Sequence, residues 1–164
     1  MTQFAKVWHF TRARLEQAMQ GLTHEQMCWR PHSEAHTIFE LLYHIAGAEY
    51  YWANRLGNRP PQSEFERRLD RAVIESFLAE GEFPFGTEDL TDSAVRSALR
   101  FSYDCLRPII EEPSAIQLAM SLVSPVGDEV DGHTGLIRIA QHAGYHTGQI
   151  WLMKMGPRFP GTRS

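Results

Sequence analysis

Apolar residues recur every three or four positions over four long stretches of the chain, and this spacing constrains the fold more than any other feature. Such spacing is typical of amphipathic helices that bury one stripe against their neighbours. The four stretches cover about residues 2–21, 37–56, 92–112 and 134–155, and none of them shows the alternation of a half-buried strand. We therefore expect an all-α protein, a four-helix bundle.

Glycines and prolines mark the ends of these helices. Gly57 follows the second helix, and Pro60 and Pro61 prevent it from continuing. Residues 62–82 have the spacing of an extra short, charged helix between the second and third long helices. We expect it to cover one end of the bundle, with a lid or an oligomer contact as alternatives. Pro125 and Gly127 indicate a long crossover over 114–133 before the last helix, with a short strand or turn.

The length of 164 residues is that of a single domain with a real core, and we place this domain at residues 1–156, followed by a C-terminal tail at 157–164. The net charge is -4, and the basic residues do not form a cluster of their own, because acidic residues lie among them. One mixed segment holds Glu64, Glu66, Arg67, Arg68, Asp70 and Arg71. These features argue against a nucleic-acid partner.

Two cysteines, Cys28 and Cys105, do not make a disulfide framework. The N-terminal residues lack the charged and apolar regions of a secretory signal, and no apolar run approaches the roughly 18 residues of a membrane span. We therefore expect a cytoplasmic protein with no membrane partner.

The eight histidines include a pair with the spacing of metal ligands. His142 and His146 are four residues apart in the last predicted helix, so they lie one turn apart beside its apolar stripe. His44 flanks the apolar stripe of the second predicted helix. Three imidazoles from two facing helices would bind a divalent metal ion and leave coordination positions open, as catalytic sites do.

The same histidine pattern has other interpretations. An inward histidine is often a satisfied core residue, and two histidines four apart also occur by chance. Ala143 follows His142 where a zincin protease would have its glutamate. Glu40 shares a helix face with His44 and either orients it or is solvated. His36, Glu40 and His133 are weak candidates for a general base, so the catalytic residues stay unknown.

Several motifs in order resemble the DinB/YfiT-like superfamily of metal-binding four-helix bundles. They are Gly21-Leu22-Thr23-His24-Glu25-Gln26, Trp29-Arg30-Pro31, the stretch 37–52 around His44, and the stretch 142–150 around His142 and His146. The resemblance is weakest over 57–90. It implies that His44, His142 and His146 bind a divalent metal ion, most often zinc or nickel, and that the protein is a homodimer.

Some members of that superfamily look like S-transferases that use low-molecular-weight thiols, and others resemble hydrolases in the metal site. The resemblance thus implies a metal-dependent enzyme, either a thiol S-transferase or a small-molecule hydrolase, acting on a small-molecule substrate. The alternatives are a non-catalytic metal or small-molecule binding protein and a stress-associated interaction module that uses residues 62–82. Phe10 and Tyr51 do not both fit the inward stripes, which predicts a dimer contact through the first two long helices.

Overall fold

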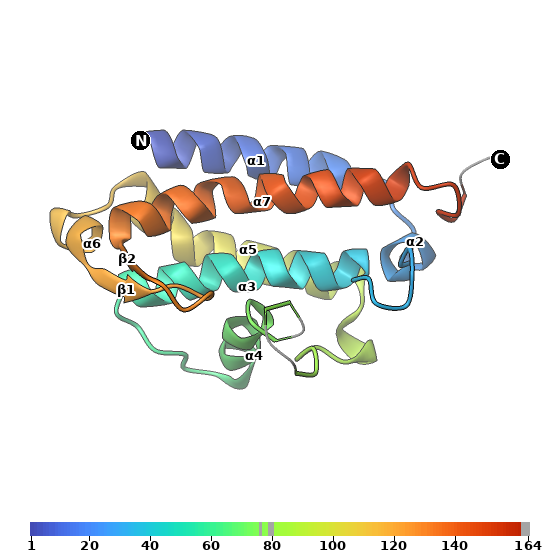
Figure 1. Ribbon diagram of the computed structural model, residues 1–164, viewed down its shortest axis with the longest axis horizontal. Helices are drawn as coiled ribbons and strands as arrows, with labels where there is room; N and C mark the ends of the chain where they lie inside the picture. The colour runs from blue at the N-terminus through green and yellow to red at the C-terminus, as the bar shows by residue number, and fades with distance from the viewer. Residues whose placement is uncertain (76, 79–80, 162–164) are drawn as a thin grey trace.

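Four long helices form the bundle in the computed structural model, which describes residues 1–75, 77–78 and 81–161 (Figure 1). They are α1 (Gln3–Met19), α3 (Ile38–Leu56), α5 (Asp92–Glu111) and α7 (Gly132–Lys154). Helix α1 packs along α7, while α3 packs against both α5 and α7. The expected all-α bundle is confirmed.

Each long helix begins at a side chain that satisfies its first backbone N–H groups. Thr2, Thr37 and Thr91 accept a hydrogen bond from the third residue of α1, α3 and α5, and Asp131 does the same for α7. In α3 the cap is reciprocal, because Glu40 accepts a bond from the backbone N–H of Thr37. The short helix α2 (His24–Cys28) joins α1 to α3.

Helix α3 lies at the centre of the molecule, and nearly all of its residues are buried, including polar ones. Glu49 is 1% exposed. Its carboxylate accepts hydrogen bonds from the Trp8 indole at 2.8 Å, the Ser102 hydroxyl at 2.8 Å and the Arg12 guanidinium at 3.3 Å. These hydrogen bonds connect α1, α3 and α5 around a buried ion pair between Glu49 and Arg12.

The extra helix between the second and third long helices is α4 (Glu64–Ala72), which packs against α3. The approach is close at Gly47, where an added Cβ would lie 2.5 Å from the carbonyl oxygen of Leu69. The helix predicted over 62–82 is too long, because α4 ends at Ala72. Residues 76, 79 and 80 of that prediction lie outside the described residues. Beyond a short 3-10 turn η1 (Thr87–Asp89), the chain enters α5.

The expected crossover before α7 contains helix α6 (Ala115–Ala119) and an antiparallel hairpin of β1 (Ser121–Val123) and β2 (Glu129–Asp131). Leu122 pairs with Val130, and Gly127 takes φ +88° in the connecting turn. The sequence did not predict α6. Past α7, in the stretch expected as a tail, Phe159 is buried with its ring edge-on to Trp29. Within the described part of the chain, every helix is too short or too polar to cross a membrane.

Candidate metal centre

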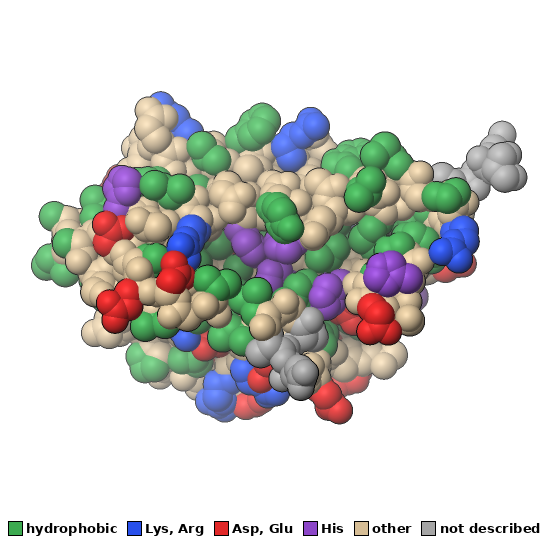
Figure 2. All heavy atoms as spheres, viewed as in Figure 1, with side chains coloured by type: hydrophobic (Ala, Val, Ile, Leu, Met, Phe, Trp, Pro, Cys, Tyr) green, Lys and Arg blue, Asp and Glu red, His purple; other side chains and the backbone are tan. Residues whose placement is uncertain are grey.

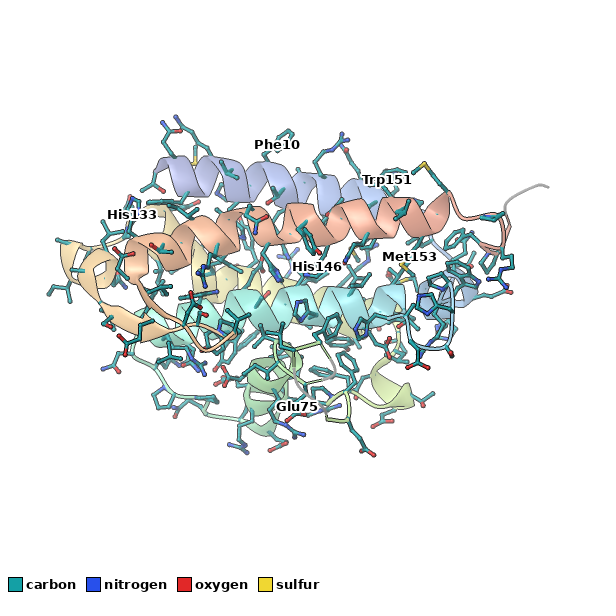
Figure 3. The ribbon with its side chains drawn as sticks, in the orientation of Figure 1. Phe10, Glu75, His133, His146, Trp151 and Met153 are labelled. Carbon is teal, nitrogen blue, oxygen red and sulfur yellow. The ribbon has the colours of Figure 1, made fainter. Side chains whose placement is uncertain are left out.

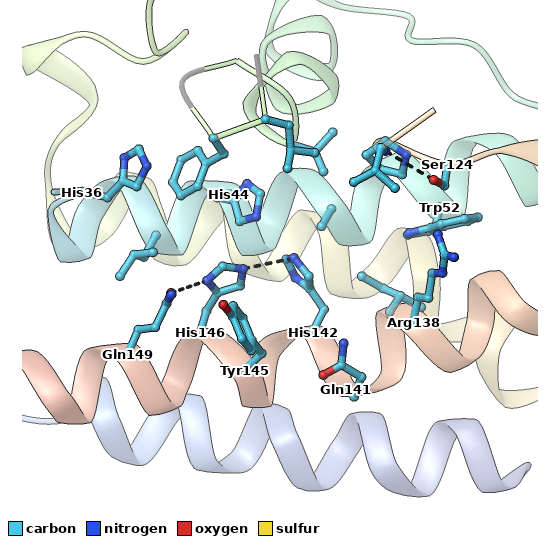
Figure 4. A pocket seen from close by; sticks show the side chains of 18 residues that line it. His36, His44, Trp52, Ser124, Arg138, Gln141, His142, Tyr145, His146 and Gln149 are labelled. Atoms are coloured by element: carbon cyan, nitrogen blue, oxygen red, sulfur yellow. Dashed lines mark hydrogen bonds between the residues drawn. The ribbon is translucent and has the colours of Figure 1, made fainter. Parts of the chain in front are cut away.

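The three histidines singled out in the sequence meet between α3 and α7. His44 projects from α3 toward His142 and His146, which lie one turn apart on α7 (Figure 4). One ring nitrogen from each of the three lies within 4.8 Å of the others. The Nε2 atoms of His142 and His146 are 3.2 Å apart. Two nitrogens bound to one tetrahedral ion at about 2.0–2.1 Å would stand about 3.3–3.4 Å apart, so this spacing fits a shared ion.

Hydrogen bonds on the far side of two rings fix which nitrogen faces the centre. The Nδ1 of His44 lies 3.1 Å from the backbone carbonyl oxygen of Ala72, and the Nδ1 of His146 lies 2.7 Å from Oε1 of Gln149. Because both oxygens only accept, each Nδ1 carries the proton and donates it, and each Nε2 keeps a free lone pair. The buried Nδ1 of His142 has no hydrogen-bond partner among the described residues.

Burial keeps the three imidazoles neutral. Loss of hydration, with a smaller contribution from His146, lowers the pKa of His44 from 6.5 to about 3. Burial also lowers the pKa of His142 well below its usual value, and that of His146 in the same direction. Neutral imidazoles are the form that binds a metal ion, so at pH 7 the site needs to lose no protons before binding.

The three histidines line a cavity of about 620 Å³ that opens to solvent, and histidine side chains are visible near the middle of the face in Figure 2. One wall is formed by Phe77 and Leu78, which follow α4, and another by Pro125 and Val126 in the β1–β2 turn. No fourth histidine, cysteine or carboxylate ligand joins the three histidines in the part of the chain that is described. An ion held there would keep positions open toward the cavity, as catalytic metal sites do.

Of the weak candidates for a general base, only His36 lines this cavity. Its Nδ1 is 3.9 Å from the Glu40 carboxylate, and burial lowers its pKa. Glu40 does not orient His44, because its carboxylate caps the start of α3 and pairs with Arg30. His133 is exposed, packs edge-on against Phe4 and is absent from the cavity lining.

The groups that hold the histidines in place are not among the residues predicted from the sequence. The ring of Phe77 stacks between His36 and His44, with centroid distances of 3.8 and 4.0 Å and interplanar angles of 13° and 14°. Ala72 contributes only a backbone carbonyl, which no sequence pattern reveals. Gln149 was detectable, because a residue three positions after His146 on a helix lies beside it.

Comparison with known families agrees with this geometry. The DinB superfamily matches residues 8–150, a range that contains all three histidines and both helices that carry them. The comparisons with curated proteins and with solved structures gave no match. The match covers most of the chain and agrees with the resemblance seen in the sequence motifs. The chain therefore belongs to the DinB superfamily.

Proposed function

We propose that the protein binds a divalent metal ion, zinc or nickel, through His44, His142 and His146 and uses it as a metal-dependent thiol S-transferase. The observation that carries the proposal is the convergence of three neutral imidazoles, without a fourth protein ligand among the described residues, on the floor of an open cavity. When bound, the ion supplies positive charge that stabilises a thiolate at the pH of the cell.

The residues around the cavity define the protein's own part in this reaction. The Ala72 carbonyl and Gln149 hold Nε2 of His44 and of His146 toward the centre. Phe77 stacks on one face of the His44 ring, which is 4% exposed, so water has little access to that ring. The cavity volume of about 620 Å³ is within the usual range for small-molecule sites.

The described lining offers a hydrolase a single candidate for a general base, His36. Among the described lining residues there is no aspartate or glutamate, and His36 is the one histidine outside the centre. A hydrolase gains from a general base that takes a proton from water. A thiol has a reference pKa of about 8.5, and metal binding deprotonates it outright, so that it needs no such base.

The experiment starts from protein purified without a histidine tag. Elemental analysis should give one zinc or nickel ion per chain, and the loaded protein should conjugate small thiols to an electrophile faster than the chelated protein does. Metal binding without any conjugation would favour the alternative, a non-catalytic metal or small-molecule binding protein. Failure to bind zinc or nickel would refute the proposal.

We also propose a cytoplasmic homodimer, with a contact surface that differs from the one expected from the sequence. Tyr51 is buried, and its hydroxyl donates to the carbonyl oxygen of Val123, so α3 offers no contact there. Phe10 is 66% exposed and points away from the bundle beside α7, where Trp151 is also partly exposed (Figure 3). The contact is therefore proposed for α1 and α7.

Cys28 and Cys105 are both free thiols, in agreement with a reducing compartment such as the cytoplasm.

A further inference from the structure

The cavity above the histidines has walls that are mostly apolar. Side chains from four separate segments form them: Trp52 on α3, Val73, Phe77 and Leu78 after α4, Val126 in the β1–β2 turn, and Ile139 on α7. The polar lining residues outside the histidines are uncharged amides and hydroxyls, with a single exception. A ligand in this cavity therefore contacts surface that offers little to a charged group.

The exception is Arg138, the one lining residue with a permanent charge among those described. Its guanidinium donates two hydrogen bonds to the Asp128 carboxylate, at 2.9 and 2.6 Å. Asp128 also accepts a hydrogen bond from the Ser124 hydroxyl, and these bonds hold the pKa of Asp128 below its usual value. The carboxylate thus stays ionised and neutralises Arg138, so the pair adds no net charge to the cavity.

The position of this pair matters for a ligand that reaches the centre. Arg138 and Ser124 lie beside Trp52 at one end of the cavity, while His36 and Gln149 lie at the other end, with the three histidines between them (Figure 4). A ligand bound at the histidines through one atom extends its remaining atoms along apolar walls. An ionic group on that extension would lose water without gaining an unpaired opposite charge, because Arg138 is already bound to Asp128, and this is unfavourable.

We propose that the cavity selects a thiol with an uncharged, largely apolar body, aromatic or branched, and discriminates against thiols that carry a carboxylate away from the sulfur. This inference rests on the proposed function, because the sulfur is placed at the histidine centre. A metal ion held by the three histidines would supply the positive charge that keeps the sulfur as a thiolate, and the thiol proton would leave to solvent. The cavity volume of about 620 Å³ is within the usual range for small-molecule sites and accommodates an aromatic ring.

Two thiols of the same shape test the selection. Protein loaded with Co²⁺ is titrated with 4-methylbenzenethiol and with 4-mercaptobenzoate at about pH 8, where the carboxyl group of the second compound is ionised. The visible bands of Co²⁺ and the sulfur-to-metal charge-transfer band report binding without any need for turnover. We expect the methyl compound to bind at least about tenfold more tightly, which is about 1.4 kcal/mol. Equal binding, or a preference for the carboxylate, would overturn the inference.

A matched pair of variants adds a cation inside or outside the cavity. Val126 is 67% exposed in the cavity wall, and Ile116 is 78% exposed on α6, outside the lining. Val126→Lys should shift the preference toward 4-mercaptobenzoate by about tenfold, while Ile116→Lys should leave it unchanged. The same shift in both variants would show a general charge effect and overturn the inference. A protein that takes up no Co²⁺ refutes the proposed function, whereas a loaded protein that binds both thiols equally refutes only the selection.

Discussion

Replacement of Gln149 by leucine should weaken metal binding without loosening the fold. Oε1 of Gln149 accepts the 2.7 Å hydrogen bond that places the proton of His146 on Nδ1. Without it, the ring of His146 gains freedom to rotate and to place its proton on Nε2, which then cannot bind a metal ion. Loss of such an outer partner typically reduces metal affinity 10- to 100-fold, or about 1.4–2.8 kcal/mol. The lower part of that range is expected here, because His44 keeps its backbone partner at Ala72.

Gln141 provides a matched control for this change. It lies on the same helix and lines the same cavity, and its side chain makes no hydrogen bond to the three histidines within the described structure. Zinc affinity is measured by competition with a chromophoric chelator for the parent protein, Gln149→Leu and Gln141→Leu, and thermal melts of the metal-free proteins report the fold. Equal affinities in the two variants would show that the hydrogen bond to His146 does not support the site.

Other outcomes follow from the same structure. Glu49→Ala leaves Arg12 charged and unpaired in the core, so the free energy of unfolding measured by urea denaturation should fall by about 3–5 kcal/mol. Glu64→Ala, which removes an exposed ion pair, should lower it by at most about 1 kcal/mol. Equal decreases in the two variants would contradict a stabilising buried ion pair. The lowered pKa of His44 means that the unfolded chain binds more protons than the folded one between about pH 3 and 6.5. Metal-free protein should therefore lose stability as the pH falls below about 6.5, and a melting temperature that stays constant from pH 7 to 5 would refute this. His146→Ala should abolish tight metal binding yet keep the helical circular dichroism, since apolar burial provides most of the stability; loss of helicity together with metal would make the site structural. Phe10→Ser should convert a dimer to a monomer of 18.8 kDa in light scattering, and a parent protein that is already monomeric at micromolar concentration would exclude the dimer.

The four long helices were predictable because their causes are local. The apolar spacing identified each of them, and residues such as Thr91 and Gly57 lie at their ends as expected. Helix α4 was predicted in the right place but too long. The period of apolar residues continues past Ala72 through Val73 and Phe77, yet these two side chains pack over the histidine cavity rather than continue the helix. The spacing of apolar residues alone does not show whether a residue is buried on a helix face or in an irregular segment that covers a cavity.

The histidine centre was predictable only in part. The spacing of His142 and His146 follows from one helical turn, and His44 was added because it flanks the apolar stripe of another helix. The role considered for Glu40 did not hold, because its carboxylate satisfies the start of its own helix instead. A helix cap forms between residues only a few positions apart. The spacing of Thr37 and Glu40, three positions apart, therefore already indicates the capping role of Glu40 in the sequence.

The sequence by itself determined that this chain is helical, where its long helices lie, and which three histidines are available to one centre. The tertiary structure alone decided what surrounds that centre. Phe77 stacks on His44 from a segment beyond the next helix, the carbonyl of Ala72 orients its ring, and Asp128 neutralises Arg138 at the cavity edge. These contacts join residues that are far apart in the chain or belong to its irregular segments. Their formation depends on how the helices pack and where the connecting segments close over them, and the periodicity of a helix carries no information about either.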